Sequence, residues 1–213
     1  MDSHTKDITL SNIELSSASA NGLTLKVVGN QCQVVNCHFP LSNPTQTGLA
    51  DITAINITLK DSTVANLLLY GVAFYMHPSA NLTVTNCTFT NTTNATAIAV
   101  NSTSVSIKIS ALTIIGCTYT LEADFPVGAG LAIAPINSTV EISDSYFEGN
   151  AFYTVNDRFG GVISLYLRNS SAVIRNCKLE NNYSKFGTVR LFLAEKSNLT
   201  LLDMEAYNCS AVG

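Results

Sequence analysis

A six-residue pattern returns along the whole chain and constrains its fold more than any other feature. It reads apolar, any residue, Asn/Asp/Gly, a small residue or Cys, any residue, apolar, as in VVNCHF at residues 34–39. Eight copies begin at Leu10, Val34, Leu59, Val84, Ile114, Ile142, Ile174 and Leu202, with starts 24, 25, 25, 30, 28, 32 and 28 residues apart. This period fits one rung of a parallel β-helix, built from three short strands and three bends. The pattern therefore predicts an all-β, right-handed parallel β-helix of about eight rungs.

Each position of the pattern has a physical role. The apolar residues point into the core, and Asn, Asp or Gly at the third position tolerates the left-handed backbone of a bend. Asn stacked on Asn from rung to rung can form a ladder of side-chain amides. A second series of strand openings keeps step with the first, at Gly22, Gly48, Gly71, Ala97, Gly130, Gly161 and Gly187. We expect a single domain over residues 1–213, either a fragment of a longer chain or one unit of a stack.

Six cysteines raise the question of disulfides. Cys37, Cys87, Cys117 and Cys177 all take the fourth position of the pattern, where other copies carry Ser or Ile. This placement predicts small, buried and mostly reduced side chains. In this alignment Cys87 and Cys117 fall on neighbouring rungs, although stacked side chains orient their Cβ atoms poorly for a bridge. At least one bridge remains the alternative.

Eleven asparagines begin an Asn-X-Ser/Thr sequon, more than chance predicts. Ten of them are predicted glycosylation sites: Asn56, Asn81, Asn91, Asn94, Asn101, Asn137, Asn169, Asn182, Asn198 and Asn208. Those shortly before a repeat copy should form one outer column (Asn56, Asn81, Asn137, Asn169, Asn198), and those after the bend a second (Asn91, Asn94, Asn182, Asn208). The eleventh, Asn86, belongs to the bend ladder and is expected to be too buried. N-linked glycans imply a eukaryotic secretory pathway and an extracellular or cell-surface location.

The composition of the chain limits the kinds of binding partner to be expected. Charged residues make up only 12% of the chain, the net charge is −4, and no basic run occurs. Nucleic acid and anionic membranes are therefore not expected as partners. No apolar stretch reaches the roughly 18 residues that a transmembrane helix needs.

One rung carries a family resemblance. The run FEGN at residues 147–150, followed by GGVI at 160–163, resembles the repeat of chlamydial polymorphic outer-membrane proteins. More broadly, nearly the whole chain resembles the pectin-lyase-like β-helix superfamily. The resemblance implies a fold and a cell-surface setting, but no reaction. The dense sequons depart from the bacterial family and suggest a eukaryotic source.

Candidate chemistry is sparse. The lyases and hydrolases of this superfamily use acidic calcium ligands with Arg or Lys, or Asp pairs with His-Gly, and those motifs are missing here. The histidines, at positions 4, 38 and 77, are expected on different rungs without acidic neighbours. We expect no metal or cofactor. Possible binding loops lie where the repeats lengthen, around Glu122, Asp124, Asp157 and Arg158.

The repeat, the sequons and the missing motifs together favour a non-catalytic structural glycoprotein, a rigid rod in a filament, surface appendage or wall layer. Uncapped β-helix ends expose strand edges, so end-to-end self-association or contact with neighbouring domains is expected. A surface adhesin is the first alternative. A polysaccharide lyase- or hydrolase-like enzyme is the second.

Overall fold

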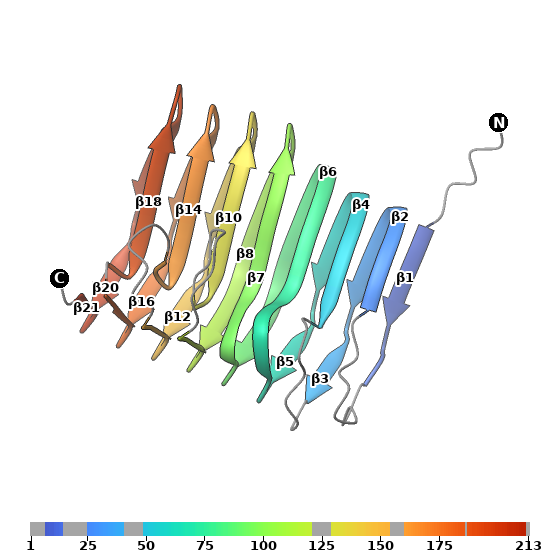
Figure 1. Cartoon of the computed structure of the whole chain (residues 1–213), viewed down its shortest axis with the longest axis horizontal. Coiled ribbons are helices and arrows are strands. Elements are labelled where there is room, and N and C mark those ends of the chain that lie inside the picture. The colour runs from blue at the N-terminus through green and yellow to red at the C-terminus, as the bar shows by residue number, and fades with distance from the viewer. Residues whose placement is uncertain are drawn as a thin grey trace.

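The computed structural model describes residues 7–14, 25–40, 49–120, 129–153, 160–185 and 187–211. These residues contain strands and no helix, and each strand pairs in parallel with the equivalent strand of the next turn. Figure 1 shows the strands side by side, with the two termini at opposite ends of the stack. The predicted all-β parallel β-helix is confirmed. The number of rungs stays a prediction.

The longest ladder runs through the whole described stack. Its strands are β1 (Asp7–Ser11), β2 (Leu25–Val35), β4 (Ala50–Lys60), β6 (Leu68–Thr90), β8 (Ser106–Ile115), β11 (Thr139–Ser143), β15 (Ser171–Arg175) and β19 (Asn198–Leu202). One inward column of this ladder contains Leu10, Val34, Leu59, Val84, Ile109, Ile142, Ile174 and Leu201. From Val34 to Ile174 these side chains are at most 1% exposed, so the column forms the centre of the core.

Two further ladders close the turns. After the first bend come β3 (His38–Pro40), β5 (Thr63–Ala65), the ends of β6 and β8, β12 (Tyr146–Glu148), β16 (Lys178–Glu180) and β20 (Glu205–Tyr207). The other side contains β7 (Thr93–Thr103), β10 (Leu131–Ile136), β14 (Ile163–Arg168) and β18 (Val189–Ala194). Short strands lie between them: β9 (Thr118–Tyr119), β13 (Ala151–Phe152), β17 (Tyr183–Ser184) and β21 (Ser210–Ala211).

Two copies of the sequence pattern were misaligned. The fifth begins at Ile109 rather than Ile114, because Val84 pairs with Ile109, whereas Ile114 pairs with Phe89 in the neighbouring column. The bend of this copy carries Ala111, which adopts φ 49° without the usual Asn or Asp and so hides the repeat. The last copy begins at Leu201 rather than Leu202, since Leu201 pairs with Ile174. Adjacent leucines made this one-residue slip invisible in the sequence.

The bends behave as the pattern predicts. Asn12, Asn36, Asp61, Asn86, Asp144, Asn176 and Asp203 all have φ between 48° and 56°. Along this bend, side-chain amides donate to the preceding turn: Asn36 Nδ2 to Asn12 Oδ1 at 2.7 Å, Asn86 Nδ2 to Asp61 Oδ1 at 2.8 Å, and Asn176 Nδ2 to Asp144 Oδ1 at 2.6 Å. The predicted amide ladder is confirmed, and it has one direction.

Where the residue after the first bend is serine, its hydroxyl points inward and accepts from a backbone N–H of the preceding turn. The backbone N–H of Cys37 donates to Ser62 Oγ at 3.2 Å, and that of Leu112 donates to Ser145 Oγ at 3.2 Å. The thiol of Cys87 instead donates to carbonyl oxygens, that of Thr85 in its own turn at 3.3 Å and that of Leu59 in the preceding turn at 3.5 Å. Buried amides need partners. A serine at the fourth position of the pattern therefore supplies the partner that a buried amide of the preceding turn requires.

All six cysteines are free thiols. Cys37, Cys87 and Cys177 share the column after the first bend, but Cys117 does not. It follows the second bend, at Gly116, in the column where the next turn has Asn150. The predicted position of Cys117 beside Cys87 was therefore wrong, for the same reason that the fifth copy was misaligned.

Candidate functional site

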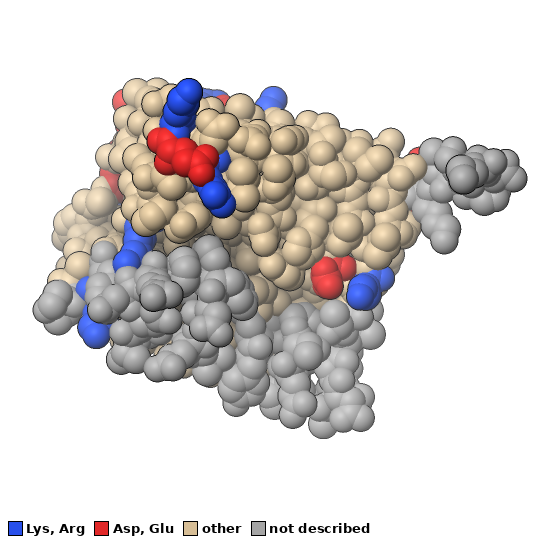
Figure 2. All heavy atoms as spheres, turned by 45° about the horizontal axis from the view of Figure 1, so that its top comes forward, with Lys and Arg blue, Asp and Glu red and all other residues tan. Residues whose placement is uncertain are grey.

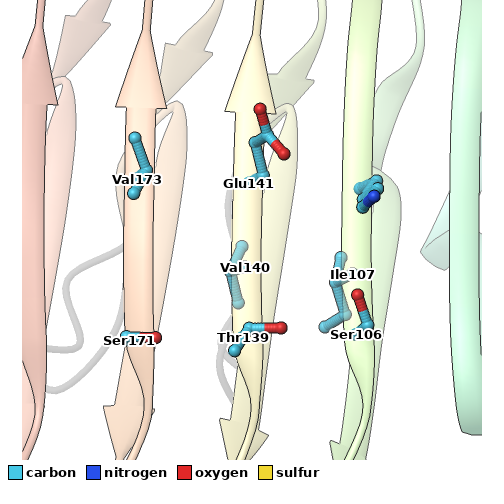
Figure 3. Close-up of a pocket in the computed structure, with 8 residues that line it drawn as sticks. Ser106, Ile107, Thr139, Val140, Glu141, Ser171 and Val173 are labelled. Carbon is cyan, nitrogen blue, oxygen red and sulfur yellow. The ribbon is translucent and has the colours of Figure 1, made fainter.

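A shallow groove crosses three neighbouring strands on the outer face of the helix. It has a volume of about 390 Å³, and Figure 3 shows its lining side chains on β8, β11 and β15. Two rows of equivalent positions cross it. Ser106, Thr139 and Ser171 form one, and Lys108, Glu141 and Val173 form the other.

A second hollow beside this groove adds charge. Lys108 and Glu141 line both, and Asp144 and Arg175 line the second. Arg175 Nη2 lies 2.9 Å from Glu141 Oε1, and this carboxylate raises the pKa of Arg175. The amide of Asn176 lowers the pKa of Asp144. The Arg175 and Glu141 side chains are 46% and 40% exposed, so solvent screens the pair and it contributes little to stability.

The groove is open and carries both signs of charge. Figure 2 shows the same character over a wider face, where charged side chains gather in a few small groups on a mostly uncharged surface. Hydroxyl, carboxylate and guanidinium groups in strand register can bind an extended polar partner. Among the described residues, no three His, Cys, Asp or Glu side chains group as metal ligands would.

One histidine has an acidic neighbour that the sequence did not indicate. His77 Nε2 lies 3.8 Å from Asp51 Oδ1, and its ring meets that of Tyr75 edge-on at 4.2 Å between centroids. These residues lie on β4 and β6, and stacking in register brings them together. The expectation that each histidine lacks acidic neighbours was wrong for His77. His38 is exposed and contacts Thr63, as an outward strand residue should.

The four residues predicted for binding loops, Glu122, Asp124, Asp157 and Arg158, lie outside the described residues. Their binding role stays a prediction.

Most sequon asparagines lie on the outside of the helix. Those that are exposed or partly exposed are Asn56, Asn81, Asn86, Asn91, Asn94, Asn101, Asn137, Asn169, Asn198 and Asn208. Many sit in bends with a left-handed backbone, as Asn137 and Asn169 do. Such positions are accessible to a glycan without disturbing a strand.

Two sequons differ from their prediction. Asn182 is only 1% exposed, its Nδ2 donates to the carbonyl oxygen of Phe147 at 2.8 Å, and its Oδ1 accepts from the backbone of Asn150. A glycan on that nitrogen is incompatible with this fold, so Asn182 is withdrawn as a site. Asn86 was expected to be buried, but it is exposed while its amide takes part in the bend ladder.

The two predicted columns are also rearranged. Asn56, Asn81 and Asn198 do occupy one row across the longest ladder. Asn137 and Asn169 lie just before that row, in a bend of their own, where Asn169 Nδ2 donates to Asn137 Oδ1 at 2.6 Å. In the second set, Asn208 Nδ2 donates to Asn181 Oδ1, and Asn91 Nδ2 to Asn66 Oδ1, so these sequons continue another amide ladder.

The FEGN…GGVI run has a structural explanation. Asn150 is fully buried; its Oδ1 accepts from the backbone N–H of Cys117 at 2.9 Å and its Nδ2 donates to the carbonyl oxygen of Ile114 at 2.8 Å. Gly160 has φ 127°, and a Cβ there would lie 1.8 Å from the Phe152 ring. The motif thus joins neighbouring turns and fits the chain around the Phe152 ring.

Comparisons with known proteins agree with this architecture. The fold is that of a parallel β-helix, a solenoid of stacked turns. The family described as "Right handed beta helix region" matches residues 52–213, and the chain belongs to it. No curated protein and no solved structure matches the chain. Within the described residues, no helix is long and apolar enough to cross a membrane.

Proposed function

We propose that this chain is a non-catalytic, N-glycosylated structural protein that forms a rigid extracellular rod in a filament, surface appendage or wall layer. The observation that carries this proposal is the position of the sequons. All but Asn182 place their asparagine on the outside of a continuous β-helix. Glycans at those positions would coat the rod and oppose lateral aggregation of its sheets.

The core supports a mechanical rather than a catalytic role. Its columns are filled by aliphatic, aromatic and thiol side chains, and burial raises the pKa of Cys32 and Cys87 to about 11. Thiols with such pKa values stay protonated near neutral pH and are poor nucleophiles. Interiors of this density transmit strain along the stack.

A surface adhesin is the second candidate, and the groove around Lys108 and Glu141 favours it. In that case the rod would present the outer face of β8, β11 and β15 to a polar partner. Replacing Lys108 and Glu141 together by Ala would abolish such binding without unfolding the chain, because Lys108 is exposed and Glu141 is partly exposed.

Intact mass tests the glycoprotein part. Chain secreted from eukaryotic cells should lose mass on enzymatic deglycosylation. Asn137→Gln should remove one glycan, whereas mass-spectrometric mapping of the wild-type chain should find the peptide containing Asn182 unmodified. A mass unchanged by deglycosylation would overturn the proposal. Release of oligosaccharides from cell-wall polysaccharides by the purified protein would favour the enzyme alternative instead.

A further inference from the structure

The apolar core is incompletely covered at both ends of the described stack. Half-buried apolar side chains that pack against the core are Ile8, Leu10, Ile13, Leu25, Val189, Leu191, Leu199, Met204 and Cys209, from the first and last turns. Leu201 is 49% exposed, although its equivalent one turn earlier, Ile174, is 0% exposed. A further turn placed on either end would bury these side chains.

The strand edges at the two ends match each other. β1 and β19 belong to the same ladder, and each contains five residues. Within the described chain, β1 pairs with β2 and β19 pairs with β15, so each keeps one free edge. A five-residue parallel pairing between these edges repeats the β15–β19 pairing in length and direction.

We propose that β19 of one molecule pairs with β1 of a second copy, in the register that continues the internal ladder. This inference rests on the proposed role as a rod and names its partner. Leu201 then packs on Leu10 of the second copy, and Leu199 on Ile8. This contact is heterologous, with a different surface on each side, and therefore propagates from copy to copy.

The bend ladder supplies the hydrogen-bond complementarity for this register. Within the molecule, an Asn donates to an Asp of the preceding turn twice, Asn86 to Asp61 and Asn176 to Asp144. The last residue of the ladder is Asp203 and the first is Asn12. The proposed register places Asn12 of the second copy directly after Asp203, so the same Asn-to-Asp hydrogen bond forms across the junction.

One contact in this register opposes association. Glu14 pairs with His38, and Glu205 pairs with Lys178, along the ladder after the first bend. Continuing that row places Glu205 beside Glu14 of the second copy. Like charges directly opposite each other on adjacent strands are destabilising. The register therefore predicts that Glu14→Lys strengthens the junction.

Sedimentation velocity of the purified 213-residue chain, over a concentration series, tests the junction. The wild-type chain should form linear oligomers. Asn12→Asp, which sets two carboxylates against each other, should weaken association about tenfold. Adding Asp203→Asn removes the pair of carboxylates but reverses the donor direction, so it should recover only part of the lost association, about threefold. A chain that stays monomeric throughout would overturn the inference.

The charge row gives an independent check. Glu14→Lys should strengthen association, and adding Glu205→Gln should cancel most of the gain, because the new lysine then has no carboxylate opposite it. Melting followed by circular dichroism should be unchanged in these variants, which separates a junction effect from misfolding. Oligomers insensitive to all four substitutions would overturn this register while leaving the proposed rod function intact. Loss of the rod function would instead appear as unglycosylated native material.

Discussion

The turns containing β2, β4 and β6 and the turns containing β10, β14 and β18 bury similar columns but close differently. In the first set, equivalent residues lie 25 apart, and β2 and β4 each run unbroken for eleven residues. In the second, equivalent residues lie 32 apart between β10 and β14 but 26 apart between β14 and β18, and left-handed residues at Asn137 and Asn169 break the same path into two strands. Figure 1 shows β10, β14 and β18 ending in arrowheads at the edge of the stack where the ribbons of β2, β4 and β6 continue.

The two sets of turns also differ in the side chains that fill their interiors. The first set packs Phe74 between Phe39 and Phe89, with ring centroids 5.9 and 6.0 Å apart. The second adds fully buried polar side chains, and Asn150 alone connects three turns through its amide. The additional bend also leaves backbone N–H groups without strand partners, and buried hydroxyls accept from them: Ser138 Oγ from the N–H of Val105 and Ser170 Oγ from the N–H of Ser138, both at 3.1 Å. The longer turn thus depends more on polar side chains.

The largest effect is expected from the aromatic stack of the first set. Phe74→Ala should lower the free energy of unfolding by about 3–5 kcal/mol, because it leaves a cavity between two other rings. Urea denaturation followed by circular dichroism measures this. The matched Phe192→Ala removes a ring that is 49% exposed and should cost far less. Equal costs would show that the stack is not the centre of stability.

Removing the buried amide tests the second set. Asn150→Ala should cost about 2–4 kcal/mol, since it leaves the N–H of Cys117 and the carbonyl of Ile114 without their partner. Asn181→Ala, at the neighbouring exposed bend, serves as control and should cost about 1 kcal/mol. If both substitutions lower the free energy of unfolding equally, the buried amide of Asn150 contributes no more to stability than an exposed bend residue does.

The bend at Ala111, which lies between the two sets of turns, can be stabilised by substitution. Ala111 has a left-handed backbone in a column otherwise occupied by Asn and Asp. Ala111→Asn should raise the free energy of unfolding by about 1 kcal/mol, because Asn tolerates this conformation and can join Asn86 to Asp144 in the ladder. Ala111→Gly measures the backbone contribution alone, since glycine removes the strain of the left-handed conformation and adds no side-chain amide. A lower free energy of unfolding for the Asn variant would contradict the claim that an amide at this position stabilises the bend.

The last effect is confined to alkaline pH, where the buried thiols ionise. Cys32 and Cys87 have a pKa near 11 in the folded chain against 9.0 for a free thiol, so folding favours the protonated form. Their contribution to stability is complete below about pH 9 and is lost progressively as pH rises to about 11. Urea midpoints measured across this range should fall. In the Cys32→Ala, Cys87→Ala double variant the decline should be shallower.

The sequence indicates the fold wherever a bend residue is chemically distinctive. Asn36, Asn86 and Asn176 mark their turns because a left-handed backbone favours Asn, and the apolar column follows from them. Ala111 carries no such signal, so the fifth turn, and with it Cys117, was misplaced. The Asp51–His77 proximity could not be foreseen, since it depends on register between residues 26 apart. Likewise, Asn182 and Asn137 carry the same sequon, and only the fold separates inside from outside.

The constant step of 25 residues among the earlier turns has a consequence for how such a gene can change. Residues 34, 59, 84 and 109 occupy one column, and contacts join each turn to its immediate neighbours. Duplicating or deleting one 25-residue segment would keep every column in phase and alter the rod by one strand spacing, about 4.8 Å. Length can therefore evolve in whole turns, without any new interface having to arise.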